Sequence, residues 1–397
     1  MTTTPAPSAS VWRATGMPAL LAVTALGFAG YAVLLPVAPL WAVEGGSGLV
    51  GAGWVTGLFM FATVAGQTMV PAALGRFGWA PVLVTGLVLL GLPAPLMLVS
   101  ADLGPVLFWS GVRGLGFAVL TVAGSSAVAE LIEPARRGRA LGAWGLAIAG
   151  PQLVLLPLAP VVAEHLGYAP VFLAAAVPLL GIVPAVRLAR HLAALPPHPT
   201  EHVHASQGAR AAFVALFRPV AILIAVTLAG GALITFLPQM SGDEVLTAVA
   251  LFGLTGMAAL TRWLIGGPAD RFSARALMWP LVLCTVAGLS LTAWAVVDAE
   301  ATLGWALLGG AALVGVAYGG LQNLTLGEAF AAVGPRDTLL ASAVWNIGFD
   351  AGTGVGAVVV GALAAGFSFP VALLAAAGVS LATLPLALVR RRVSLGR

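Results

Sequence analysis

The most informative shortage in this sequence is charge. Charged residues make up 8% of the 397 residues, whereas a soluble domain carries about 25%. Hydrophobic residues make up 60%, and the mean hydropathy is +1.04, so the chain has too few polar side chains to cover a water-soluble surface. The composition excludes a large soluble domain and predicts an integral membrane protein.

Other residue types are scarce as well. The chain has no lysine, and its one cysteine is Cys284. A single cysteine excludes disulfide bonds within the chain and a cysteine-rich metal site. Five glutamines, two asparagines and three tyrosines leave few side chains for binding sugar hydroxyls. A phosphate-binding loop, a nucleophile elbow and a loop long enough for an enzyme site are also missing. We therefore expect no enzyme activity, no cofactor and no metal.

Long apolar stretches recur along the chain, each ended by glycine, proline or charge. A hydrocarbon core about 30 Å thick takes about 20 helical residues, and twelve stretches are long enough to cross it. They lie at about 17–41, 49–74, 80–100, 105–130, 139–163, 168–188, 219–240, 243–267, 276–298, 303–330, 339–365 and 369–389. The sequence predicts an all-α membrane protein with twelve transmembrane helices.

These stretches divide the chain into two halves of six helices. Residues of the first half recur in the second about 200 positions later: Pro134 and Pro335, Trp144 and Trp345, Leu35-Pro36 and Leu237-Pro238. Two parallel six-helix repeats are a known transporter plan, which here predicts two bundles in a pseudo-two-fold repeat. The predicted parts are an N-terminal arm (1–16), a first bundle (17–188), a linker (189–218), a second bundle (219–389) and a basic tail (390–397).

Arginine is distributed unevenly among the predicted loops. If the N-terminus is cytoplasmic, sixteen of the eighteen arginines fall on the cytoplasmic side, and the opposite loops hold seven acidic residues and no arginine. Cytoplasmic loops of membrane proteins collect basic residues. We therefore predict a multi-pass protein of the inner (cytoplasmic) cell membrane with both termini in the cytoplasm.

This orientation makes a direct prediction for reporter fusions. A reporter that works only in the cytoplasm should be active when fused after Arg397 or inserted in the linker 189–218, because both segments lie on the arginine-rich side. A reporter that works only outside the cytoplasmic membrane should be inactive at both places. Activity of the second reporter at either position would refute the orientation.

A loop motif lies between the predicted helices 243–267 and 276–298. Residues 266–275 read Gly-Gly-Pro-Ala-Asp-Arg-Phe-Ser-Ala-Arg and resemble the G-x-x-A-D-R-x-G-R-R loop of the major facilitator superfamily (MFS). The matching residues include Gly266, Asp270, Arg271 and Arg275. The resemblance extends to length, helix count, repeat and orientation, and it points to bacterial twelve-helix drug or metabolite:proton antiporters. It implies the MFS fold and a role for these four residues in conformational switching.

The first half carries a weaker copy of this loop. Gly75-Arg76-Phe77-Gly78 repeats Arg-Phe and lacks the Asp. By the same resemblance, Arg76 could meet Glu130, and Glu328 could meet Arg271. In the second copy, Asp270 can accept hydrogen bonds from the free N–H groups of the following helix; the plainer interpretation is a solvated turn with an ordinary helix cap.

Arg113 lies within the predicted helix 105–130, followed by glycines in a pattern that resembles the fourth-helix motif of the MFS. A charged arginine in hydrocarbon costs at least about 2.5 kcal/mol. Arg113 must therefore face a cavity or a partner. It is either a residue of the transport cavity that takes part in proton coupling or a structural arginine bonded to helix carbonyls.

Gly150-Pro151 in the predicted helix 139–163 is similar to the Gly-Pro motif that marks the antiporter branches of the superfamily. Proline inside a membrane helix kinks it and frees a carbonyl. This helix is either a mechanical element of the switch between states or a bent helix without directional meaning.

Asp350 is the only acidic residue near the middle of a predicted helix. It shares one helix face with Ser342, Asn346 and Thr353. Ionising a carboxyl in hydrocarbon is costly unless it is paired or hydrated, so an intramembrane acid is by default a functional hypothesis. Asp350 is the predicted proton-coupling residue; the alternative is a packing role among glycines. The candidates for the substrate cavity are Tyr31, Gln322, Asn323, Trp345 and Asn346.

These observations together predict a secondary active transporter. We expect proton-coupled efflux of a small amphipathic or apolar compound by a monomer in the lipid bilayer, without nucleic acid as a partner. Two alternatives stay open. One is a metabolite uptake symporter or facilitator of the same fold, and the other is a transport-inactive membrane sensor or assembly partner.

Overall fold

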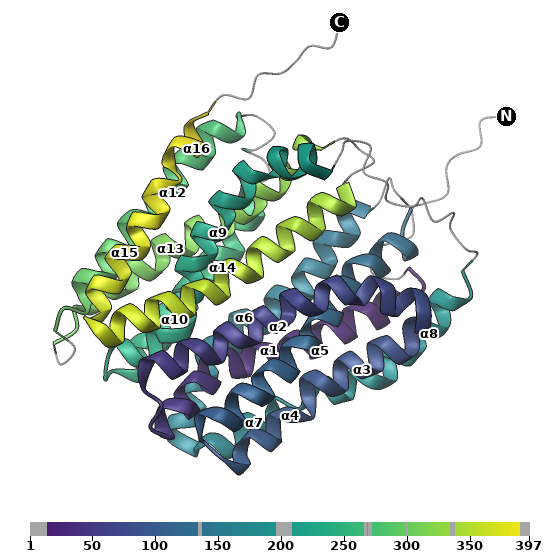
Figure 1. Ribbon diagram of the computed structural model, residues 1–397, viewed down its shortest axis with the longest axis horizontal. Coiled ribbons are helices and arrows are strands. Elements are labelled where there is room, and N and C mark those ends of the chain that lie inside the picture. Colours follow the sequence, from purple (N-terminus) through teal and green to yellow (C-terminus); the bar gives the residue numbers. More distant parts are fainter. Residues whose placement is uncertain are drawn as a thin grey trace, which may run out of the picture.

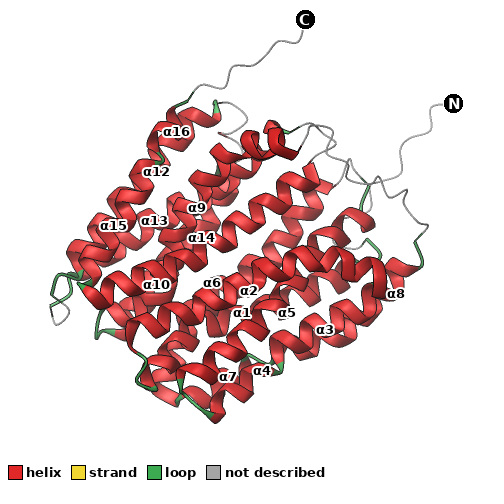
Figure 2. Ribbon diagram, in the orientation of Figure 1, coloured by secondary structure: helices red, strands yellow, loops and turns green. Residues whose placement is uncertain are grey.

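The computed structural model describes residues 14–133, 137–195, 209–265, 268, 272–298, 301–333 and 338–389. Within these ranges twelve helical segments are long and apolar enough to cross a membrane, and none of the described residues forms a strand (Figure 2). The predicted all-α membrane fold with twelve spans is confirmed.

The first six spans form the first bundle, and the last six form the second. The first six are α1 (Met17–Glu44), α2 (Gly48–Phe77), α3 with α4 and η2 (Trp79–Gly91, Pro93–Leu96, Met97–Val99), α5 (Leu103–Leu131), α6 (Arg137–Leu166), and α7 with η4 and α8 (Tyr168–Ala174, Val177–Gly181, Ile182–Ala193). The last six are α9 (Ala209–Met240), α10 (Glu244–Leu264), α12 (Ala274–Ala295), α13 (Gly304–Ala332), α14 (Thr338–Gly366), and α15 with α16 (Phe369–Ala382, Leu384–Leu388).

Three of the predicted apolar stretches form broken spans. In each, a shorter helical piece has a proline in its first turn: Pro93 in α4, Pro178 in η4 and Pro385 in α16. Proline has no N–H to donate, and its backbone suits the first turn of a helix, so a span can end before it and begin again. Hydropathy alone does not reveal these breaks.

Helix continues into both ends of the predicted linker 189–218. Helix α8 runs to Ala193, and α9 begins at Ala209. The last turn of α8 carries Arg190 and His191, which are polar but compatible with helix. Polar side chains therefore indicate where the chain leaves the hydrocarbon layer and not where the helix ends.

The two bundles lie side by side in Figure 1, the first in purple to teal and the second in green to yellow. We call the end of the molecule where α1 and α9 begin and α16 ends the terminal end, and the end where α1 meets α2 and α9 meets α10 the distal end. Helices α2 and α14 run along the boundary between the bundles (Figure 1). Any movement of one bundle against the other must change the contact between these two helices.

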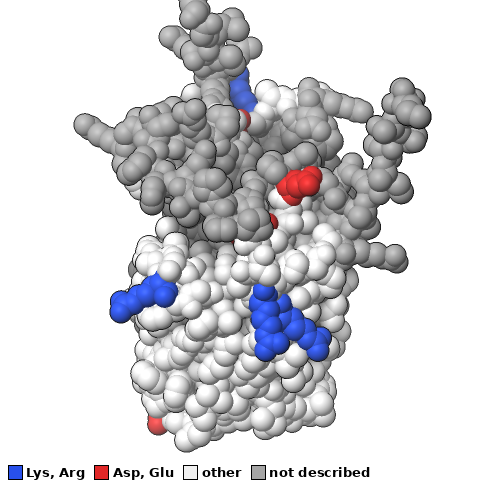
Figure 3. Space-filling model, turned by 90° about the vertical axis from the view of Figure 1, so that its right-hand side faces the viewer, with Lys and Arg blue, Asp and Glu red and all other residues white. Residues whose placement is uncertain are grey.

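The outer surface suits lipid. Large apolar side chains such as Phe108, Leu173 and Leu180 are exposed on the outside of the first bundle, where contact with water would be unfavourable. On the face drawn in Figure 3, the visible arginines lie close to the grey residues in the upper half, and a broad area below them has no charge down to one acidic side chain at the lower edge. This arrangement fits a protein that spans a bilayer several times.

Candidate functional site

The two bundles touch tightly along the distal half of α2 and α14. A Cβ atom on Gly53 would lie 2.5 Å from the carbonyl oxygen of Ala357, and one on Gly354 would lie 2.9 Å from Cβ of Met60. Only glycine permits such an approach of two helices. This contact closes the boundary between the bundles towards the distal end.

Further along the same two helices, a buried hydrogen bond joins the bundles. Nε2 of Gln67 donates to Oδ2 of Asp350 at 2.6 Å and to Oγ1 of Thr121 at 3.2 Å. Asp350 is 4% exposed and Gln67 is 6% exposed. The other end of the Gln67 amide, Oε1, is buried and has no hydrogen-bond partner among the described residues. An amide of the first bundle thus holds the carboxyl of the second.

Two tyrosines lie near this carboxyl, one from each bundle. Tyr31 of α1 and Tyr318 of α13 are both within electrostatic reach of Asp350 and of each other. The ring of Tyr31 stacks on Phe117 with centroids 4.3 Å apart, and the ring of Tyr318 lies 6.0 Å from that of Phe349. The middle of the boundary therefore combines one acidic group, one amide and two phenols with aromatic walls.

The remaining substrate-cavity candidates lie in the second bundle. Gln322 accepts a hydrogen bond from Arg262 at 3.2 Å, and Nδ2 of Asn323 donates to the Arg262 carbonyl at 3.2 Å. The indole of Trp345 is buried and donates to Oγ1 of Thr325, while Asn346 donates within its own helix. The structure thus gathers Gln322 and Asn323 around Arg262, and it places Trp345 in the core of the bundle.

Arg113 lies in the first bundle, 3% exposed. Its Nε donates to the carbonyl of Leu90 at 3.1 Å, and its Nη2 donates to the carbonyl of Gly30 at 2.9 Å. Cζ lies 5.6 Å from the centre of the Phe59 ring, close enough for a cation–π interaction. No hydrogen bond or ion pair joins it to Asp350 in the described part of the chain. The carbonyl contacts fit a structural role, yet Arg113 also faces a pocket.

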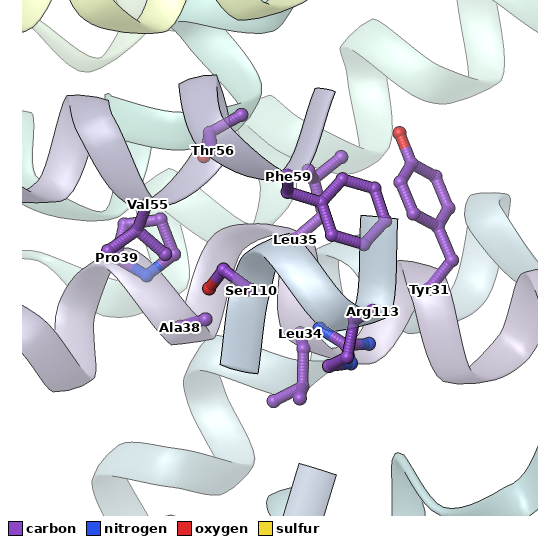
Figure 4. Close-up of a pocket in the computed structure, with 10 residues that line it drawn as sticks. All are labelled: Tyr31, Leu34, Leu35, Ala38, Pro39, Val55, Thr56, Phe59, Ser110 and Arg113. Atoms are coloured by element: carbon purple, nitrogen blue, oxygen red, sulfur yellow. The ribbon is translucent and has the colours of Figure 1, made fainter. Parts of the chain in front are cut away.

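That pocket lies between α1, α2 and α5 (Figure 4). Its walls are mainly apolar, and in this conformation it has room for about one water molecule. Ten residues line it: Tyr31, Leu34, Leu35, Ala38, Pro39, Val55, Thr56, Phe59, Ser110 and Arg113. Of the predicted site residues, the pocket brings together Tyr31 and Arg113.

Three residues of the loop motif, Gly266, Asp270 and Arg271, lie outside the described residues. Arg275 is half-buried in the first turn of α12. Ser273 caps this helix, because its side chain accepts from the backbone N–H of Ala276 at 3.3 Å. The bonds expected of Asp270 lie outside the described residues; Ser273 did not follow from the sequence pattern, although serine before a helix is a standard capping signal.

The other predicted switch residues lie on three helices, α2, α5 and α6. Arg76 is exposed at the end of α2, with Cζ 5.3 Å from the centre of the Phe77 ring, and Glu130 is half-buried in the last turn of α5. Gly150 and Pro151 lie in α6, where Gly150 is exposed and faces open space. None of these four residues lies in the pocket or at the Asp350 contact.

Two contacts of acidic side chains did not follow from sequence reasoning. Glu328 pairs with Arg218 of α9 at 3.3 Å, and His165 at the end of α6 lies 3.4 Å from Glu244 at the start of α10. The second pair joins the two bundles at the distal end. His165 lies in the last turn of α6 and Glu244 is the first residue of α10, whereas Arg218 and Glu328 lie within α9 and α13. The sequence shows these side chains but not which of them meet.

The chain is similar to known proteins in both sequence and structure. A model of the Major Facilitator Superfamily matches residues 20–327, and no curated protein matches the sequence. Two solved structures of a bacterial homologue of the human lysosomal transporter Spinster are similar, both inward-facing. The unoccupied one has a TM-score of 0.72 and 15% identity over 98% of this chain and 97% of the other. The occupied one has a TM-score of 0.74 and 14% identity over 96% of this chain and 97% of the other.

A third similar structure is that of a mutant of the nucleoside transporter NupG. It has a TM-score of 0.71 and 13% identity, over 94% of this chain and 98% of the other. At identities this low, the structural likeness shows the fold alone.

Proposed function

The chain belongs to the major facilitator superfamily, and on that premise we propose that it exports a small amphipathic or apolar compound in exchange for protons. In this proposal the two bundles alternate between states open to either side of the membrane. The protein works as a monomer in the inner cell membrane, with both termini in the cytoplasm.

The observation that carries proton coupling is the hydrogen bond between Gln67 and Asp350. Alternating access changes the angle between the bundles, and with it the spacing and hydration of this pair on α2 and α14. A charge is far more costly in a dry contact than in water. The proton occupancy of Asp350 therefore differs between the two states, which is the linkage that coupled transport needs.

Helix α6 supports the proposed direction of transport. Helix α6 carries Gly150-Pro151, the step that resembles the antiporter motif, and it also crosses to the second bundle, where Leu153 lies 3.6 Å from a Cβ atom built on Gly256. A kinked helix at this boundary transmits a bundle movement in a protein that exchanges substrate for protons. The apolar lining of the pocket at Tyr31 favours a compound with a hydrophobic part.

A flux measurement in vesicles tests the proposal and separates it from uptake by symport. The purified protein is reconstituted into liposomes that contain a pH-sensitive dye and have an acidic lumen, and a panel of amphipathic compounds is added outside. An exchanger lets protons leave as the compound enters, so the lumen becomes more alkaline and the compound accumulates there. Acidification of a neutral lumen on addition of the compound indicates symport instead.

The same measurement exposes a transport-inactive protein. Such a protein would leave the pH of the lumen unchanged with every compound of the panel, as would liposomes without protein. That result would overturn the proposal.

A further inference from the structure

The guanidinium of Arg113 is a buried cation without a countercharge. No acidic side chain in the described ranges forms an ion pair with it, and its two hydrogen-bond partners are neutral carbonyls from α1 and α3. A buried charge that is not paired is strongly unfavourable. The carbonyls and the Phe59 ring offset part of this cost, and an anion close by would offset much more.

Two donors at this place remain open to the pocket. Nη1 of Arg113 and Oγ of Ser110 form no hydrogen bond with any described residue. Both residues line the pocket, and Figure 4 draws their side chains among the ten that surround it.

These donors are arranged for one small anionic group. Ser110 and Arg113 are three residues apart on α5, so their side chains lie on the same helix face. Arginine presents several N–H donors in a fixed plane that suits carboxylate oxygens. A hydroxyl one helical turn from a guanidinium, in the same pocket, can supply a second donor to one carboxylate.

The rest of the pocket has the opposite character. Leu34, Leu35, Val55 and Phe59 offer apolar surface next to the two donors. A ligand that fits both parts has a carboxylate at one end and a hydrocarbon chain or ring at the other. From this geometry we propose that Arg113 and Ser110 bind the carboxylate of the transported compound, which is therefore an amphipathic carboxylic acid.

The site is connected to the predicted proton-coupling residue through α2. The pocket now has room for about one water molecule, so a hydrocarbon tail enters only when a wall moves. Val55 and Thr56 of α2 form one wall, and the same helix carries Gln67 with its bond to Asp350. Binding of the acid at Arg113 thus moves α2, whose Gln67 donates a hydrogen bond to Asp350 of α14. This inference rests on the proposed transport function and names its substrate class.

A binding experiment tests the inference without transport. Octanoate is titrated into the purified full-length protein in detergent at neutral pH, and octanamide serves as an uncharged ligand of matched length. Hydrogen bonds to a charged group contribute about 1.5–3 kcal/mol, which corresponds to about 10- to 150-fold in affinity. We expect octanoate to bind at least about tenfold more tightly than octanamide.

Variants locate the binding. Arg113→Gln should weaken octanoate at least about tenfold and leave octanamide unchanged, and Ser110→Ala should weaken octanoate several-fold. Arg187→Gln is the matched control for loss of one positive charge, because Arg187 is exposed on α8, and it should bind octanoate like the wild type. If Arg113→Gln does not fold, Ser110→Ala still decides, since it keeps both carbonyl contacts of Arg113.

Three results would overturn the inference. Equal binding of octanoate and octanamide would exclude a carboxylate site, and unchanged octanoate affinity in the folded Arg113→Gln or Ser110→Ala variant would place the site elsewhere. Chloride could also stabilise the wild-type protein but not Arg113→Gln, with no competition between octanoate and chloride. That result would show that the pocket binds a free inorganic anion. Asp350→Asn should still bind octanoate, so a failure of proton coupling is distinguishable from a failure of this site.

Discussion

Replacing Asp350 by Asn should abolish pH-driven uphill transport and leave exchange of the substrate down its own gradient within about twofold of wild type. Asn has nearly the same shape, and its Oδ1 can accept the hydrogen bond from Gln67 that Asp350 accepts at 2.6 Å. The contact between α2 and α14 is therefore retained. What is lost is the ability to bind and release a proton, which no neutral amide replaces.

The measurement compares accumulation and counterflow in the same liposomes. Accumulation is followed with an imposed pH difference, and counterflow with equal pH on both sides and labelled substrate outside. Asp243→Asn is the matched control: Asp243 caps α10 by accepting from Leu246 at 2.9 Å, and Asn caps equally well. Accumulation at wild-type rates by Asp350→Asn would show that the proton is carried elsewhere, with Glu130, Glu328 and Asp270 as the next residues to test.

Replacing Gly53 by Ala should lower the transport rate about tenfold or more, because it would prevent closure at the distal end. The new Cβ atom would lie 2.5 Å from the backbone oxygen of Ala357, and a backbone atom in a helix cannot rotate away. Overpacking of this kind costs about 1–3 kcal/mol, which shifts the balance between two states about 5- to 150-fold. The bundles then favour the state in which α2 and α14 are apart at this end.

Cysteine labelling reads out this shift. Thr235 is fully buried and donates to Thr56 of the other bundle at 3.2 Å, so a cysteine there reports on the boundary between them. In a Cys284→Ala background, Thr235→Cys should react slowly with a maleimide in the parent protein and several times faster with Gly53→Ala. Gly378→Ala, at a glycine that faces open space, should change neither labelling nor transport. Unchanged labelling with lost transport would contradict the explanation.

Sequence patterns predict the architecture well because the bilayer imposes one simple rule. An uninterrupted apolar stretch of about 20 residues has to be helical in hydrocarbon, so the number and order of the spans follow from composition alone. The ends of helices are predicted less accurately from composition. The helix predicted at 49–74 spans Gly48–Phe77 in the structure. The backbone hydrogen-bond ladder continues past the point where the side chains turn polar.

The candidate site is less accessible to such reasoning. Asp350 stands out because an acid in mid-helix is rare. Gln67, its partner, is 283 positions away and has no feature that distinguishes it from other polar side chains of its helix face. The partners of Arg113 are the carbonyls of Gly30 and Leu90, and a main-chain carbonyl leaves no trace in the residue letters. These contacts depend on how distant helices pack together. The residues around each position do not specify that packing.

Only one end of the Gln67 amide forms hydrogen bonds with described residues, and the other end bears on the proposed proton coupling. A carboxylate accepts hydrogen bonds only, and the Nε2 end of the amide meets that need now. A protonated carboxyl carries an O–H that must be accepted, and the idle Oε1 end of the same amide can accept it after a half-turn about the last bond of the side chain. The hydroxyl of Thr121, at 3.2 Å from Nε2, now donates to the carbonyl of Ala118; it can turn and donate to Oε1 instead, so it tolerates either orientation of the amide. In the proposed mechanism the first bundle thus registers the charge on the second by the rotation of one amide group, before any helix has moved.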